Sequence, residues 1–340
     1  MARRDGDGGT PPAALGEMIR GALLTQLLYV AARLDLPERL RAGPRPAAAL
    51  AAAVGADPGA LARLLRALAF LGVVREEAGA FALTPAGARL QAGAPGSLRG
   101  SALFYGAPWS WQAFGALLEA VRTGIPAFRT VHGTGLFEYL ARHPEAAETF
   151  NEHMLAVTGQ DAEAIVAAYD FGGLGRIVDV GGGHGALLAA ILRRVSAARG
   201  VLFDRASVVE GAREFLGAAG LADRCELRGG SFFEAVPPDG DCYLLKDILH
   251  DWDDERALAV LRACRRAMAP AARLLVIERV LPADGTPAPG ALVDVVMLVL
   301  TGGQERTERE YRALLAAAGL RLTRAVPTAS PMTVLEAGHP

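Results

Sequence analysis

Apolar residues near the start of the chain recur at helical spacing. An amphipathic helix is expected where they follow one another at every fourth position, at Leu15, Ile19, Leu23 and Leu27. A second apolar helix should begin at Asp57, the N-cap residue before Pro58, and end before Gly72. Residues 36–40 and 46–54 form shorter apolar segments between these two helices.

Two short apolar runs, over residues 73–74 and 80–82, flank a polar Glu-Glu-Ala-Gly turn and predict a β-hairpin. Helix, helix and hairpin in this order are typical of a winged helix-turn-helix. The helix that would enter a DNA groove offers only Arg63 and Arg66, so a DNA-binding regulator is the weaker interpretation. We therefore interpret residues 15–98 as a winged-helix-like dimerisation domain that follows a disordered tail over residues 1–14.

Residues 99–169 are expected to be helical and carry most of the aromatic side chains, including Trp109 and Phe150. Such a cluster either lines an apolar pocket or forms a helical core, and spacing leaves both possibilities open. We interpret this segment as a helical linker that contributes to a substrate pocket, with Trp109 as a candidate wall residue.

The pattern changes near residue 170, where short β-rich runs begin to alternate with amphipathic helices. Seven strands are predicted, over residues 177–180, 200–204, 225–227, 242–245, 274–278, 320–325 and 331–336. The alternation predicts an α/β domain over residues 170–340, with a doubly wound, mostly parallel sheet and ligands at the carboxyl ends of its strands. Only a short turn separates the last two strands, so they should form an antiparallel hairpin at one edge.

Charge and cysteine content limit the partners. The formal net charge of −2 gives no electrostatic footprint for nucleic acid or an anionic membrane. The three cysteines lack metal-ligand spacing, which favours reduced, buried thiols in the cytoplasm. No uninterrupted apolar run reaches the ~18 residues of a membrane span, and the N-terminus lacks the apolar core of a signal peptide.

The first predicted strand runs directly into a glycine-rich turn. Gly181, Gly183 and Gly185 allow the backbone to turn tightly beside a ligand, and the helix that follows offers free N–H groups. Asp204 ends the next strand, where a carboxylate can accept both ribose hydroxyls of an adenosine. The turn departs from the dinucleotide pattern and is preceded by the acid Asp179. An acidic, phosphate-free site suits the sulfonium of S-adenosylmethionine.

The candidate for chemistry is His250, just past the carboxyl end of the strand over residues 242–245. Two acids occupy comparable places, Glu278 at the end of a strand and Glu305 in a Gly-Gly-Gln-Glu-Arg-Thr segment. Taken alone, a histidine among aspartates is more often a residue at a helix start or on the surface. Its coincidence with the cofactor turn favours catalysis.

Together these segments, DVGGGHG, FD, LLKDILHDWDDE, LLVIE and GGQERT, resemble one family over nearly the whole chain. It comprises the O-methyltransferases that include plant caffeic acid methyltransferases, acetylserotonin methyltransferase and bacterial enzymes that tailor polyketides and antibiotics. The sequence is most similar to the actinobacterial branch. The resemblance implies a class I methyltransferase domain and a homodimer interlocked through the N-terminal domain.

The resemblance also implies the roles of individual residues. The methyl donor would be held at Gly181, Asp204 and Lys246. His250 would act as the base, oriented by Glu278 and Glu305, and the acceptor pocket would be lined by Phe150, Met154 and Met297. A histidine of pKa ~6.5 can take the proton of a phenol of pKa ~10 as the methyl group is attacked.

The chain departs from the plant pattern at two places. Ser231 and Phe232 follow the third strand, where plant members carry an aspartate that contacts the adenine side; Ser231 can still make one hydrogen bond. Asp247 replaces a plant aromatic residue, so the acceptor should not be held like a phenylpropanoid.

The sequence therefore predicts an S-adenosylmethionine-dependent O-methyltransferase without a metal. It would act on a hydroxyl of a small, aromatic or phenolic secondary metabolite and release S-adenosylhomocysteine. The alternative is an enzyme of the same fold that hydroxylates, decarboxylates or methylates nitrogen or carbon. An oriented histidine base favours methyl transfer to oxygen.

Overall fold

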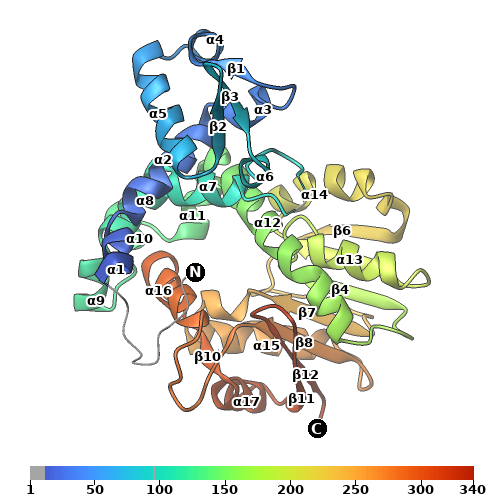
Figure 1. The fold of residues 1–340 in the computed structure, drawn as a ribbon. Helices are drawn as coiled ribbons and strands as arrows, with labels where there is room; N and C mark the ends of the chain where they lie inside the picture. The colour runs from blue at the N-terminus through green and yellow to red at the C-terminus, as the bar shows by residue number, and fades with distance from the viewer. Residues whose placement is uncertain (1–11, 95) are drawn as a thin grey trace. The chain divides into compact units, whose positions relative to one another are not determined.

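The computed structural model describes residues 12–94 and 96–340, which form two compact units (Figure 1). The first unit ends at Trp111 and the second begins at Gln112. Residues 1–11 of the predicted tail lie outside the described residues, and helix α1 (Pro12–Ile19) begins before the predicted start at Leu15.

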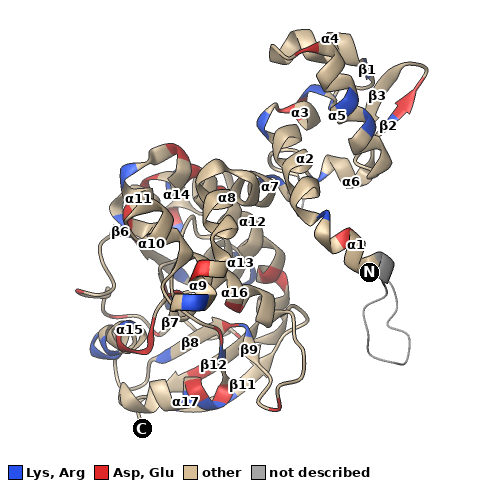
Figure 2. Ribbon diagram, turned by 90° about the vertical axis from the view of Figure 1, so that its left-hand side faces the viewer, with Lys and Arg blue, Asp and Glu red and all other residues tan. Residues whose placement is uncertain are grey.

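The first unit has the expected order of helices followed by a hairpin. Its elements are α1, α2 (Gly21–Arg33), α3 (Leu36–Arg39), β1 (Arg45–Pro46), α4 (Ala47–Val54), α5 (Pro58–Phe70), β2 (Val74–Glu77), β3 (Ala80–Leu83), α6 (Pro85–Ala88) and α7 (Arg99–Gly106). The predicted N-cap is confirmed, because the Asp57 carboxylate accepts the N–H of Ala60 at 2.7 Å. Ala78 and Gly79 both have positive φ, which allows a tight turn between β2 and β3. In the ribbon of Figure 2, α5 carries blue segments, the colour of Lys and Arg, and β2 carries red ones, the colour of Asp and Glu.

The second unit is built on a seven-stranded sheet with the order β11-β12-β8-β7-β4-β5-β6. Its strands are β4 (Arg176–Val180), β5 (Arg199–Asp204), β6 (Cys225–Gly229), β7 (Cys242–Lys246), β8 (Arg273–Glu278), β11 (Arg321–Pro327) and β12 (Thr333–Gly338). β4 to β8 pair in parallel, and β11 and β12 form the predicted antiparallel edge. After β6 the chain crosses to the other side of β4, so a ligand crevice is expected between β4 and β7.

Helices cover both faces of this sheet. They are α12 (Pro144–Ala168), α13 (Ala186–Arg194), α14 (Ala206–Ala218), α15 (Asp254–Ala267) and α17 (Glu308–Ala317). The unit also contains α9 (Leu117–Thr123), α10 (Ala127–His132), α11 (Leu136–Arg142) and α16 (Gly290–Leu300), and α8 (Pro108–Gly115) spans the unit boundary. Apolar side chains of α12, α13 and α14 pack on one face, and those of α15 and α17 pack on the other. Successive residues of β7 alternate between these two cores, as the two-residue period of a strand requires.

No single helix among the described residues is long and apolar enough to cross a membrane. Within the same described residues, the pair α4 and α5 reaches that length and composition together, and the two helices are bent by 116°.

Candidate active site

Three glycines at the end of β4 form a cradle at the carboxyl edge of the sheet. Gly181, Gly183 and Gly185 all have φ in the left-handed region, at 71°, 57° and 84°. A Cβ on Gly181 would lie 2.4 Å from Cδ1 of Ile248, so a side chain there would close the space. The predicted turn therefore forms as the sequence indicates, directly before the N-terminus of α13.

Asp204 ends β5 beside this turn. Its two carboxylate oxygens accept the N–H groups of Gly183 at 2.9 Å and of Arg205 at 2.7 Å. Burial, and then the neighbouring Asp204 carboxylate, raise the pKa of Asp179 to about 7. Two acids thus lie close together under the glycine turn, an arrangement that a bound cation would stabilise.

A single cavity in the second unit joins the glycine turn to an aromatic wall. Predicted site residues line it: Phe150, Met154, Asp179, Gly181, Gly183, Asp204, Ser231, Phe232, Lys246 and Asp247. Its aromatic wall also includes Phe137, Phe233 and Trp252, with the rings of Phe137 and Trp252 5.3 Å apart. The cavity thus combines an acidic, glycine-lined end with a flat apolar surface suited to an aromatic molecule.

Two predicted wall residues lie elsewhere. Met297 is buried in α16 and is not among the residues that line this cavity. Trp109 belongs to α8 in the first unit, where its ring packs edge-on against Phe104 at 5.5 Å. Their roles in binding an acceptor stay predictions.

His250 lies on a short 3-10 turn, Leu249–Asp251, that follows β7. Its Nδ1 atom is 2.9 Å from Oε1 of Glu305 and 3.6 Å from Oε2 of Glu278. Glu278 is held in turn, because its Oε1 accepts the N–H groups of Ile248 at 3.1 Å and of Leu249 at 2.8 Å. The structure therefore brings together the histidine and the two acids that sequence reasoning grouped.

The imidazole lies behind the cavity wall rather than in it. His250 is only 5% exposed, whereas the next residue, Asp251, lines the cavity. The Nε2 atom of His250 is 3.9 Å from Oδ1 of Asp251. Burial alone would lower the pKa of His250, but Glu278, Glu305 and Asp251 outweigh it and raise the pKa to about 10.

A buried cluster of four charged side chains lies next to His250. Asp247 has φ of 53° and pairs with Lys246 and with Arg279, whose Nη1 is 2.6 Å from Oδ1 of Asp247. Asp161 of α12 lies 3.5 Å from Nζ of Lys246. Burial would raise the pKa of Asp247, but the Lys246 and Arg279 charges hold it well below its usual range.

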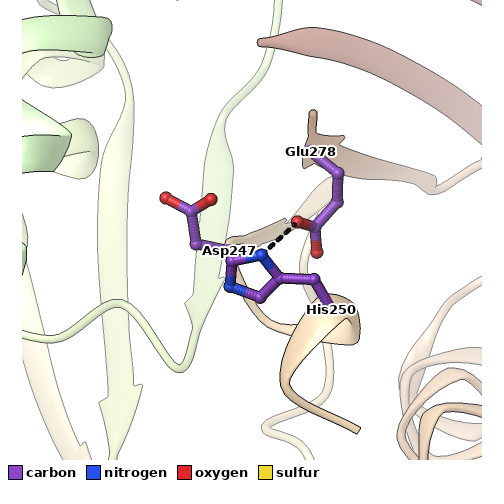
Figure 3. Close-up of side chains that lie close together, drawn as sticks. All are labelled: Asp247, His250 and Glu278. Carbon is purple, nitrogen blue, oxygen red and sulfur yellow. Dashed lines mark ion pairs between the residues drawn. The ribbon is translucent and has the colours of Figure 1, made fainter. Parts of the chain in front are cut away.

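Asp247, His250 and Glu278 each offer a ligand atom within 4.8 Å of one another, the spacing of a metal site (Figure 3). The donors are already engaged, however. Asp247 is paired with two cations, and Glu278 accepts two backbone N–H groups. This saturation favours acid–base chemistry over metal binding, because the nearby lysine and arginine charges would repel a metal ion.

The mostly parallel sheet, its glycine turn and the cavity at the β4–β7 crevice are typical of a class I methyltransferase. Residues 114–321 match the O-methyltransferase domain, and residues 17–92 match the O-methyltransferase dimerisation domain. The chain belongs to this O-methyltransferase family. The predicted fold class and family resemblance are thereby confirmed, and the dimerisation domain supports a homodimer.

Known relatives are similar over almost the full length. Phenazine O-methyltransferase PhzM from Lysobacter antibioticus is 46% identical over 322 residues, which cover 94% of each chain. The crystal structure of LaPhzM has a TM-score of 0.94 at 45% identity and covers 97% of this chain and 100% of that one. NcsB1, an O-methyltransferase from neocarzinostatin biosynthesis solved with S-adenosylmethionine and 2-hydroxy-5-methyl naphthoic acid, has a TM-score of 0.78 at 33% identity and covers 93% of this chain and 96% of its own. The chain is an S-adenosylmethionine-dependent O-methyltransferase, as predicted.

Several site residues were not singled out from the sequence. Arg279 directly follows Glu278, so its place at a strand end was a usable signal. Asp251 lies within the same short turn as His250 and could have been noticed in the same way. Nothing in the sequence marked Asp161 as a site residue, because polar residues are common in the middle of helices. Its importance comes from its burial in the folded protein.

Proposed function

We propose that the protein methylates a phenolic hydroxyl of a small aromatic natural product, with His250 as the general base. The observation that carries this proposal is the 2.9 Å contact between Nδ1 of His250 and Glu305. An ionised carboxylate only accepts hydrogen bonds, so Nδ1 carries the proton and Nε2 is the basic atom. Nε2 lies on the side of Asp251, which lines the cavity.

Other residues of the same cavity would hold the methyl donor. Bound S-adenosylmethionine supplies an electrophilic methyl group on a positively charged sulfur. Asp204, Ser231, Phe232 and Lys246 all line the cavity, where Asp204 would accept the ribose hydroxyls and Ser231 and Phe232 would contact the adenosine. The glycine turn leaves its backbone open to the donor, because a Cβ on Gly183 would meet nothing within 4 Å.

Proton removal is the task of His250. As the phenolic oxygen attacks the methyl carbon, the C–S bond breaks and the phenolic proton moves to Nε2. Glu305 and Glu278 stabilise the imidazolium that forms. A cation bound beside the acids of the cavity would favour the neutral imidazole beforehand, so the pKa of about 10 belongs to the ligand-free protein.

The aromatic wall and the relatives support an aromatic acceptor. Phe137, Phe150, Phe233 and Trp252 present flat apolar surfaces to the cavity. Among the relatives, 3-amino-4-hydroxybenzoate 4-O-methyltransferase of Streptomyces cremeus is 43% identical and covers 90% of this chain. Asp247 would face a polar group of the acceptor, with its charge balanced by Lys246 and Arg279.

A second function is favoured by two other relatives. An 8-amino-8-demethylriboflavin N,N-dimethyltransferase is 40% identical, and aclacinomycin 10-hydroxylase RdmB is 38% identical. Methylation of nitrogen, or hydroxylation, is therefore the alternative. The imidazole held between two glutamates favours O-methylation, because removal of a phenolic proton needs an oriented base.

The proposed homodimer would form through the first unit. Apolar side chains of α1 and α2 are exposed there: Leu15, Met18, Ile19 and Leu23. Such a row of exposed apolar residues is typical of an interaction surface. DNA binding remains the weaker interpretation, since β2, the wing strand, carries Glu76 and Glu77, which would repel phosphates.

Product analysis tests the proposed reaction. The protein would be incubated with S-adenosylmethionine and a panel of 3-amino-4-hydroxybenzoate, 1,4-dihydroxy-2-naphthoate, a hydroxylated phenazine and an aromatic amine. Mass spectrometry should find a methyl ether together with S-adenosylhomocysteine. A methylamine as sole product, or gain of an oxygen atom, would favour the alternative.

A further inference from the structure

Arg306 is a fully buried arginine that does not line the cavity. It is 1% exposed and belongs to the short strand β10 (Arg306–Thr307), which pairs with β9 (Val280–Leu281). Burying a guanidinium is costly unless all its N–H groups find partners. The partners of Arg306 therefore indicate what the residue is for.

All five N–H groups of this side chain are engaged. Nη1 donates to the carbonyl oxygens of Leu249 at 2.9 Å and Gln304 at 3.3 Å, and Nη2 donates to that of Trp252 at 2.8 Å. Oδ1 of Asp254 accepts from Nε at 3.0 Å and from Nη2 at 2.8 Å. Leu249 and Trp252 are the residues on either side of His250 and Asp251, so one guanidinium spans the turn that carries the imidazole.

Gly303 and Glu305, just before Arg306 in the chain, contact the same turn. Glu305 holds the imidazole through Nδ1 at 2.9 Å. Gly303 lies against the backbone of the turn so closely that a Cβ there would be 2.0 Å from the carbonyl oxygen of His250. The segment from Gly303 to Arg306 thus contacts the turn through backbone, carboxylate and guanidinium.

The backbone next to Arg306 is held by hydrogen bonds at the start of α17. Thr307 is the N-cap of α17, and it forms a capping box with Glu310, whose Oε2 accepts the Thr307 N–H at 2.8 Å. A guanidinium is planar and presents a fixed fork, so it can bridge two carbonyls at a set separation, which a lysine ammonium cannot do.

We propose that Arg306, held by Asp254, is a positioning residue that fixes the Leu249–Asp251 turn and thereby keeps the His250 imidazole on Glu305. This inference rests on the proposed role of His250 as base. Arg306 does not touch the cavity, and it acts through the backbone of its neighbours. A loose turn would misplace Nε2, and small misplacements can cost ~10²-fold in rate.

The first test compares Arg306→Lys with Arg312→Lys, a control in which an exposed arginine pairs with Glu308 on α17. With S-adenosylmethionine and the phenol that the panel identifies, Arg306→Lys should lower kcat ~10- to 100-fold, with KM for S-adenosylmethionine changed less than ~2-fold. The control should keep its kcat. An unchanged kcat in folded Arg306→Lys overturns the proposal.

A double-mutant cycle separates positioning from a general loss of structure. In a His250→Ala background, Arg306→Lys should cost less than ~3-fold, because the group it positions is gone. Multiplicative losses would mean that Arg306 acts independently of His250, and the proposal would be wrong.

A measurement without any acceptor keeps this inference distinct from the proposed function. The pKa of His250 is followed by ¹⁵N NMR of histidine-labelled protein. Arg306→Lys should move it down toward the ordinary value as the Glu305 contact loosens, and an unchanged pKa refutes positioning even if His250 proves not to be the base. Conversely, His250→Ala losing less than ~10-fold in kcat would refute only the base.

If Arg306→Lys does not fold, Asp254→Asn takes its place. Asp254 is exposed at 68% of its side chain, so this change is expected to be tolerated, yet it weakens two bonds to the guanidinium. A fall in kcat together with a lowered His250 pKa supports the proposal. If kcat and the pKa of His250 both stay unchanged, the proposal is contradicted.

Discussion

Removing the imidazole of His250 is the sharpest test of the mechanism. General base catalysis contributes ~10²–10⁴-fold, which corresponds to about 3–5 kcal/mol of activation free energy. His250→Ala should lose that much in kcat, while affinity for S-adenosylmethionine stays intact, because the glycine turn and Asp204 do not touch the imidazole. Alignment of donor and acceptor survives, so some activity should remain.

The expected pH dependence follows from the charges around the imidazole. With its pKa raised to about 10 in the ligand-free protein, His250 would be mostly protonated at pH 7. A base must be neutral, so kcat/KM of the wild type should rise with pH from 6 toward 10. The profile of kcat should level off earlier, because a bound sulfonium disfavours the imidazolium.

The assay is initial rate of methyl transfer at saturating donor, for wild type and His250→Ala, across pH 6 to 10. The kcat of His250→Ala, unlike that of the wild type, should depend on the acceptor's own ionisation. It should be partly rescued at high pH, and the defect should be smaller for more acidic phenols. Because the substitution leaves Glu278 and Glu305 buried without their partner, His250→Asn serves as a second variant that restores a hydrogen-bond donor. A near wild-type kcat at pH 7 in either folded variant would refute the assignment of His250.

Three further predictions concern binding, stability and assembly. Asp204→Ala should weaken S-adenosylmethionine binding by ~1.5–3 kcal/mol, the range for a lost charged hydrogen-bond acceptor, and calorimetry showing unchanged affinity would contradict this role. The ligand-free protein should lose stability as pH rises from 7 to 10. The reason is that the raised pKa of His250 contributes stability that is complete below ~6.5 and is lost as pH passes about 10. The melting temperature of the wild type should therefore fall over this pH range, and that of His250→Asn should fall less. Light scattering at micromolar concentration should give the mass of a dimer, and Ile19→Asp should shift it toward the monomer, since Ile19 is 75% exposed on the face proposed to be shared. A wild-type monomer mass would rule out that interface.

Much of the fold could be predicted from local pattern. Each of the seven strands of the sheet lies within a residue or two of its predicted bounds. The parallel strands are short apolar runs between helices, and the antiparallel pair is marked by the short turn that joins it. The hairpin of the first unit and the Asp57 cap were equally predictable, since turn and cap chemistry depend on a few adjacent residues. The glycine turn with Asp204 belongs here too, because consecutive parallel strands bring their carboxyl ends to one edge.

What depends on residues far apart along the chain was decided by the tertiary structure. Glu278 and Glu305 were expected near His250 from resemblance, but only packing shows that Glu305 makes the 2.9 Å contact and that Asp251, rather than His250, lines the cavity. Asp161 becomes part of the Lys246 cluster only because α12 is folded over the strand ends. The sequence pattern did not predict the five hydrogen bonds of Arg306. A hydrogen-bond network depends on where carbonyl groups lie in space, and hydrophobic periodicity carries no information about their positions.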